Sequence, residues 1–147
     1  MQSATATLIQ GMQFMVEMGE SGHALVIDAK PEVGGKNSGP RPMELMAASI
    51  VGCTAMDVVS ILRKMREKVT DMKVHVDAER AEEHPKKLTS IHITYTVMGF
   101  NLDEKKVQQA VNLSETKYCS AMASLRPGAP ITSEVILIEA VGEHLTK

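Results

Sequence analysis

The chain has 147 residues, a formal net charge of −2 and only 3% aromatic residues. Its length suits a single domain with a substantial core. The charge offers no basic surface for nucleic acid or an anionic membrane, and scarce aromatics argue against stacking on bases. The first residues lack the basic flank and apolar core of a signal peptide, and two cysteines are too few for a disulfide scaffold. We therefore expect a cytoplasmic protein.

The first 29 residues predict an antiparallel meander of three strands. Residues 5–10 and 12–18 are extended segments on either side of Gly11, and the second alternates apolar with polar side chains. A turn then leads to a third strand over residues 23–29. Residues 31–42 hold three prolines and three glycines, which predicts a loop.

Residues 43–62 are a long apolar segment with two charges, Glu44 and Asp57, and with Cys53 near the centre. We expect a helix that continues to about residue 68, because basic side chains suit its C-terminal end. The segment is long enough to span a membrane. Its charges and small residues favour the core helix of a water-soluble domain instead.

Gly52 directly precedes Cys53. Within a helix, glycine costs about 1 kcal/mol relative to alanine, so a kink or a break is expected here. A break would place Cys53 at the start of a second helix over residues 54–68, where free backbone N–H groups stabilise a thiolate.

The next part of the chain predicts a hairpin and a second helix. Residues 72–79 and 91–97 alternate apolar and polar side chains around a polar turn, which is typical of paired strands. Asn101, with Glu104 three residues later, has capping-box spacing at the start of a helix that ends near Tyr118.

A further helical turn over residues 120–125 precedes the closing strand at residues 131–141. This strand is apolar on both faces, so we expect it to be central or covered. The order of elements, βββ-α-ββ-α-β, predicts one α+β domain over residues 1–147.

Cys53 and Cys119 are 66 residues apart, so no local motif links them. A reactive thiol needs a lowered pKa and access to solvent. The residues alone leave two interpretations open: inert cysteines buried as small hydrophobic side chains, or sheltered thiol chemistry. A purely structural disulfide is disfavoured in a reducing compartment.

Other candidate sites are weaker. Asp57 is either a buried acid or a satisfied carboxylate. His75 and His92 share the polar face of the hairpin but have no third ligand, so we expect no metal site. The sequence has no phosphate-binding loop and no Ser/His/Asp arrangement, and we expect no cofactor.

Two segments, GPRPMELMAASIVGCTAMDVVSILRKMR and ETKYCSAMASL, resemble the OsmC/Ohr family of osmotically inducible and organic-hydroperoxide-resistance proteins. The likeness is to its OsmC-like branch. It implies the OsmC-like fold, with antiparallel strands and a long central helix. It also implies an intertwined homodimer, in which two six-stranded sheets wrap around paired central helices and the active sites lie between subunits.

The resemblance further implies a thiol-dependent peroxidase acting on organic hydroperoxides. On the family pattern, Cys53 is the peroxidatic cysteine and Cys119 the resolving one. The two form a disulfide that a dithiol reductant, a lipoyl-protein or a thioredoxin-like protein, then reduces.

Family peroxidases pair the reactive thiolate with a loop arginine and a glutamate just after the helix-starting proline. Here Glu44 comes one position later, and the candidate cations are Arg41, Lys36 and Arg126. Ser120 follows the second cysteine where the peroxidases usually have proline. Two alternatives therefore stand beside the peroxidase: a redox-responsive or small-ligand-binding protein with little turnover, and a structural protein with inert thiols.

Overall fold

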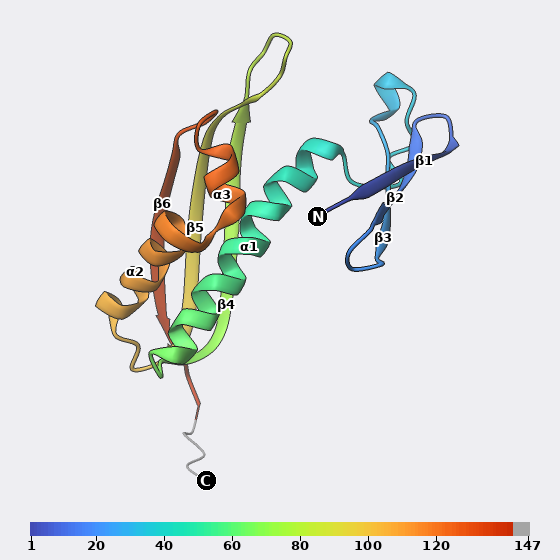
Figure 1. The fold of residues 1–147 in the computed structure, drawn as a ribbon. Coiled ribbons are helices and arrows are strands. Elements are labelled where there is room, and N and C mark those ends of the chain that lie inside the picture. Colours follow the sequence, from blue (N-terminus) through green and yellow to red (C-terminus); the bar gives the residue numbers. More distant parts are fainter. Residues whose placement is uncertain (143–147) are drawn as a thin grey trace. The chain divides into compact units, whose positions relative to one another are not determined.

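In a computed structural model of the chain, residues 1–142 are described, and they form two compact units (Figure 1). Unit 1 is Met1–Met46, and unit 2 begins at Ala47. Each unit contains a three-stranded sheet, and the long helix α1 begins in unit 1 and continues into unit 2. The α+β class and the central helix are confirmed.

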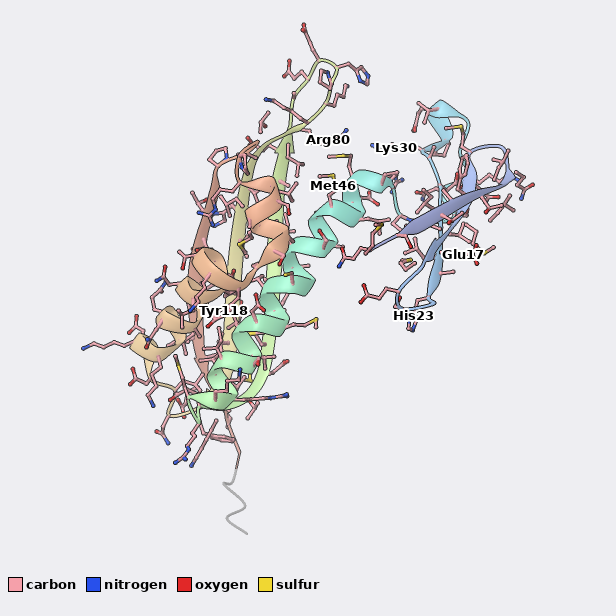
Figure 2. The ribbon with its side chains drawn as sticks, in the orientation of Figure 1. Glu17, His23, Lys30, Met46, Arg80 and Tyr118 are labelled. Atoms are coloured by element: carbon pink, nitrogen blue, oxygen red, sulfur yellow. The ribbon has the colours of Figure 1, made fainter. Side chains whose placement is uncertain are left out.

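Unit 1 is the predicted meander. Its strands are β1 (Ala4–Gln10), β2 (Gln13–Met18) and β3 (Ala24–Ile27), and they pair antiparallel in that order. Gly11 turns the chain between β1 and β2 with a φ of +53°, a conformation that favours glycine. Figure 2 shows Glu17 on β2 and His23 at the turn that leads to β3.

The loop after β3 contains a short 3₁₀ turn, Pro31–Val33, and is organised by Asp28. The buried Asp28 carboxylate accepts hydrogen bonds from the N–H groups of Ala29, Lys36 and Ser38 and from the Ser38 hydroxyl, all at 2.8–3.0 Å. These bonds lower the pKa of Asp28 to about 2, and the bond from the Ser38 N–H has the largest effect. The loop is therefore folded around one ionised carboxylate.

Unit 1 lacks an apolar core of its own. Asp28 is the one buried residue among Met1–Met46, all of which the structure describes. Several large apolar side chains are well exposed, including Leu8 at 58%, Ile9 at 50% and Val26 at 37%. A three-stranded sheet of this kind needs an apolar face packed against something to be stable.

Helix α1 (Pro42–Lys64) runs without a break through Gly52, so the expected break and second helix are wrong. Its buried residues recur every fourth position and form one stripe: Ile50, Thr54, Val58 and Leu62. Burial of this stripe outweighs the cost of one glycine. Cys53 consequently lies in the middle of a helix and not at a helix N-terminus.

The helix ends at Lys64, four residues earlier than expected. Arg66 adopts a φ of +60°, which ends a helix, and Lys68 already starts the next strand. By length and mean hydropathy (1.9), α1 passes the test for a membrane span. Core helices of soluble proteins are also this long and this apolar, so a helix of this length and composition does not by itself indicate a membrane span.

The sheet of unit 2 has the order β4-β5-β6. Strands β4 (Lys68–Arg80) and β5 (Leu88–Phe100) form the predicted antiparallel hairpin. Strand β6 (Ile131–Glu139) pairs parallel with β5, which the expectation of antiparallel strands did not include. Such a pair needs a crossover connection, and the helical segment between β5 and β6 supplies it.

The prediction that the closing strand is central or covered is wrong for the described chain. Strand β6 is an edge strand, and its Ile136 and Ile138 are 45% and 39% exposed. These apolar side chains resemble those of unit 1 in having nothing packed over them within the described residues.

Two helices connect β5 to β6: α2 (Glu104–Leu113) and α3 (Ser120–Leu125). The N-cap of α2 is Asp103, whose carboxylate accepts from the N–H groups of Lys105 and Lys106. The predicted cap, Asn101, instead takes a φ of +50° and lies outside the helix. A single π-helical turn, Ser114–Tyr118, joins α2 to α3.

The core of unit 2 lies on the inner face of β5. Alternate residues of this strand are buried, and side chains from α2 and α3 pack with them. The buried members are Ile91, Ile93, Tyr95, Val97, Val107, Ala110, Val111 and Met122.

Candidate functional site

Three side chains of unit 2 meet beside α1. The sulfur atoms of Cys53 and Cys119 and a carboxylate oxygen of Asp57 all lie within 4.8 Å of one another. Both cysteines are free thiols. The two cysteines singled out in the sequence are therefore adjacent, and Asp57 joins them.

The local fold explains how α1 presents two of these groups. Cys53 and Asp57 are four residues apart, so they share one face of the helix. That face adjoins the buried stripe that contains Thr54, which leaves both side chains half-buried at the edge of the core.

Cys119 is positioned by the π-helical turn. Its N–H donates to the Ser114 carbonyl at 2.8 Å, and its extended backbone (φ −71°, ψ 98°) precedes α3 as the N-cap. Arg126 donates from its guanidinium to the Glu115 carbonyl at 2.9 Å, which braces the same turn. Single π turns of this kind are frequent at functional sites.

The surroundings of Cys119 favour the neutral thiol. Cys119 is only 3% exposed, and burial raises its pKa to about 11. The value of about 11 already includes the lowering by the Met122 N–H and the smaller upward contributions of Cys53 and Asp57. None of these main influences is a cation. Cys119 therefore lies close to Cys53, and its main surroundings favour the protonated thiol.

A chain of buried hydroxyl groups lies behind the thiols. Ser114 donates to Asp57 Oδ2 at 3.1 Å, Thr54 Oγ1 lies 2.9 Å from Ser114 Oγ, and Tyr95 OH lies 2.7 Å from Thr54 Oγ1. Tyr95 OH also approaches Glu115 at 3.4 Å, which is long for an O–H···O bond.

Each of these hydroxyls has one proton to donate. Because Ser114 donates to Asp57, Thr54 supplies the proton between itself and Ser114, and Tyr95 donates to Thr54 at the shorter of its two contacts. The resulting chain points from Tyr95 to the Asp57 carboxylate and holds it in place. Burial raises the pKa of Tyr95 far above its ordinary value, so Tyr95 keeps its proton.

A groove of about 330 Å³ has one member of the cluster, Asp57, in its lining. Its walls are mostly apolar, with one lysine: Ser60, Ile61, Lys64, Met65, Leu113 and Tyr118. Tyr118 is labelled in Figure 2 on the π-helical turn that carries the chain from α2 to Cys119.

Of the candidate activating residues, Arg41 and Glu44 pair with each other in unit 1 at 3.0 Å. Glu44 also accepts from the Arg41 N–H, and this bond lowers the pKa of Glu44. Lys36 contributes its N–H to the Asp28 carboxylate, and Arg126 contacts the Glu115 carbonyl.

Sequence reasoning left the part played by Asp57 open and gave none to the hydroxyl chain. The four-residue spacing from Cys53 was a usable signal for Asp57. Nothing in the sequence could indicate that Thr54, Tyr95 and Ser114, from three different elements, meet in the core.

Known proteins resemble this chain over nearly its whole length. Residues 35–134 match the family model of OsmC-like proteins. Protein YhfA of Escherichia coli (strain K12) is 39% identical over 135 residues, covering 90% of this chain and 95% of YhfA.

Solved structures have the same fold. A hypothetical protein from Aquifex aeolicus VF5 is 33% identical with a TM-score of 0.79, covering 95% of this chain and 98% of that protein. An organic hydroperoxide resistance protein OsmC from Legionella pneumophila has a TM-score of 0.68 at 15% identity, over 92% of this chain and 96% of that one, and shows likeness of fold alone. By its family match and its identity to YhfA, this chain belongs to the OsmC-like protein family.

Proposed function

We propose that the protein is a thiol-dependent peroxidase that reduces organic hydroperoxides through Cys53 and Cys119. The observation that carries this proposal is the approach of the two free thiols to within 4.8 Å. A disulfide needs an S–S distance of about 2.05 Å, so the two sulfurs must move closer together when the bond forms.

The chemistry takes two steps. The Cys53 thiolate attacks one peroxide oxygen, the O–O bond breaks, and the departing alkoxide takes a proton to become an alcohol. Cys53 is then a sulfenic acid. The Cys119 thiolate attacks the Cys53 sulfur, an S–S bond forms, and the expelled hydroxide is protonated to water. The two thiols lose two electrons, and the peroxide gains them.

Several features support an organic hydroperoxide as the substrate and Cys53 as the attacking thiol. Cys53 is half-buried and Cys119 is buried, so the attacking thiol is the more accessible of the two. The groove beside Asp57 has apolar walls that suit the organic group of a hydroperoxide. The Legionella neighbour of the same fold is named an organic hydroperoxide resistance protein.

A dithiol reductant, a lipoyl-protein or a thioredoxin-like protein, completes the cycle by thiol–disulfide exchange. Two free cysteines and no disulfide among the described residues suit the reducing cytoplasm, which we propose as the location.

We assign the role of activating cation to Arg41, held by Glu44. These two already form an ion pair. Lys36, whose backbone N–H binds Asp28, and Arg126, whose guanidinium binds the Glu115 carbonyl, are the other candidate cations. Replacing Arg41 with methionine should slow oxidation of Cys53, whereas Arg63→Met at the exposed end of α1 should not.

The working molecule is a homodimer. Unit 1 exposes Leu8, Ile9 and Val26, and the edge strand β6 exposes Ile136 and Ile138. A second copy of the chain is the partner that the family resemblance implies for these surfaces. Burial of apolar surface contributes about 25 cal/mol per Å², so their cover would stabilise both units.

One observation favours the alternative of a redox-responsive or small-ligand-binding protein with little turnover. The pKa of Cys119 is raised, and the nearest charged group is a carboxylate. A resolving thiol that is seldom ionised attacks a sulfenic acid slowly.

Stopped-flow mixing of the reduced protein with an organic hydroperoxide separates the two functions. The peroxidase predicts fast loss of one thiol, abolished by Cys53→Ser. Cys119→Ser should leave the first oxidation intact and block disulfide formation, and Thr89→Ala at an exposed position of β5 should change neither step. Oxidation no faster than that of free cysteine would exclude the peroxidase. Fast oxidation without repeated turnover by either dithiol would favour the alternative.

A further inference from the structure

Two thiols and one carboxylate converge at the edge of α1, with Cys53 Sγ, Cys119 Sγ and an Asp57 oxygen all within 4.8 Å. We propose that the reduced protein binds one thiophilic divalent cation, with zinc as the biological example, through these three side chains. This site goes beyond the proposed peroxidase and does not depend on it.

The geometry is close to that of a zinc site. Tetrahedral zinc, with Zn–S of about 2.3 Å and Zn–O of about 2.1 Å, holds its ligand atoms roughly 3.5–3.8 Å apart. From the present limit of 4.8 Å, the ligand atoms would have to approach one another by about 1.3 Å at most. Cys53 and Asp57 are spaced i and i+4 on one helix, the spacing used by metal-binding histidine pairs.

The supporting contacts also suit a metal ligand. Ser114 donates to Asp57 Oδ2 at 3.1 Å, and the buried Thr54 and Tyr95 hydroxyls hold Ser114 in turn. Outer hydrogen bonds of this kind orient metal ligands and tune their affinity. The carboxylate keeps its second oxygen for a cation.

Asp57 distinguishes a metal site from a simple disulfide-forming pair. Disulfide formation requires two adjacent thiols and has no need of a carboxylate. A divalent cation, in contrast, can be bound by the carboxylate and by both sulfurs at once.

Three protein ligands leave a fourth tetrahedral position open for water or another small ligand. The groove of about 330 Å³ that Asp57 lines has room for such a ligand. The sequence does not predict this site, because Cys119 is 66 residues from Cys53 and only the fold brings them together.

Oxidation would release the cation. An organic hydroperoxide takes two electrons from the two thiolates, and two protons from solvent convert its oxygens into an alcohol and water. The sulfurs become a disulfide and cease to be thiolate ligands, and Zn²⁺ leaves unchanged. Metal binding would therefore report the redox state of the pair.

Titration of Co²⁺ into the reduced, metal-free full chain tests the site without any peroxide. We expect one equivalent per chain, a thiolate-to-cobalt charge-transfer absorption, and its loss when Zn²⁺ displaces Co²⁺. Cys53→Ser and Cys119→Ser should each reduce the absorption by roughly half and weaken binding. Asp57→Asn should weaken binding at least about tenfold. Asp77→Asn, an exposed aspartate on β4, is the matched control and should bind like the wild type.

A second variant keeps the test decisive if Asp57→Asn does not fold by circular dichroism. Ser114→Ala retains all three ligands but removes the bond that orients Asp57, and should weaken binding about tenfold. Absence of the charge-transfer absorption in the wild type would overturn the site. If Asp57→Asn folds and binds Co²⁺ as tightly as the wild type, the carboxylate has no part in binding and the proposed site is wrong. If only Ser114→Ala folds, unchanged binding by that variant would overturn the site in the same way.

Discussion

In unit 2 the inner side chains of β5 are completely buried under α1, α2 and α3, whereas in unit 1 the one buried residue is the charged Asp28. Unit 2 is stabilised by an apolar core, and unit 1 by backbone pairing and by a loop folded around a carboxylate. Unit 1 nevertheless exposes large apolar side chains. Unit 2 therefore supports the thiols with an apolar core of its own, whereas the described residues of unit 1 contain no such core.

A matched pair of isoleucines tests this contrast most strongly. Ile93→Ala in the core of unit 2 should cost about 2–5 kcal/mol of unfolding free energy. Ile9→Ala in unit 1, where the side chain is 50% exposed, should cost no more than about 0.5 kcal/mol in an isolated chain. Chemical denaturation at several protein concentrations measures both. A larger, concentration-dependent cost at Ile9 would show that another copy covers unit 1.

The two tyrosines of the chain test the buried hydroxyl chain. Tyr95→Phe removes the donor to Thr54 in the core and should cost about 1–2 kcal/mol. Tyr118→Phe, at a side chain that is 49% exposed, should be close to neutral. Equal effects in denaturant titrations would mean that the Tyr95 hydroxyl contributes nothing to unit 2.

Whether replacing Gly52 raises or lowers stability depends on whether a second copy of the chain packs against α1 at this position. A Cβ at this position would meet nothing within 4 Å, so in an isolated chain Gly52→Ala should stabilise α1 by about 0.5–1 kcal/mol. If the central helices of two copies pack at Gly52, the added methyl group destabilises the dimer instead. Thermal unfolding, together with the molar mass in solution, distinguishes the two results.

The smallest expected effect is local to unit 1 and depends on pH. Backbone and hydroxyl donors, with the Ser38 N–H first, lower the pKa of Asp28 from 3.8 to about 2. A lowered folded-state pKa stabilises the loop above pH 3.8, and this contribution is lost as the pH falls through 2. The amide NMR signals of Lys36 and Ser38 should titrate near pH 2, and Asp28→Asn should remove the titration. A midpoint near 3.8 would contradict the carboxylate-centred loop.

Much of the fold follows from periodicity. Alternation over β4 and β5 predicts the hairpin, and the apolar run of residues 43–62 predicts the central helix. Local propensity alone predicted a break at Gly52 that does not occur. Burial of Ile50, Thr54 and Val58 on either side of the glycine keeps the helix continuous. The apolar pattern of β6 predicted a covered strand, but Ile136 and Ile138 are well exposed in the described chain, because the pattern does not reveal that β6 lies at the edge of its sheet.

The candidate site, like the fold, could be predicted from the sequence only in part. The family resemblance identified Cys53 and Cys119, and the fold brings their sulfurs together. The position of Asp57 beside them and its support by Ser114 depend on contacts between residues 57 positions apart in the chain. Such contacts carry no periodic signal, so sequence reasoning had no means of predicting them.

The proposed peroxidase requires Cys53 and Cys119 to act as one dithiol. The intact mass of the reduced protein, measured after one equivalent of an organic hydroperoxide and followed by peptide mapping, tests this requirement. We expect the loss of two hydrogen atoms per chain and a peptide pair joined between Cys53 and Cys119 of the same chain. Two thiols left free, or a disulfide formed only between different chains, would contradict it.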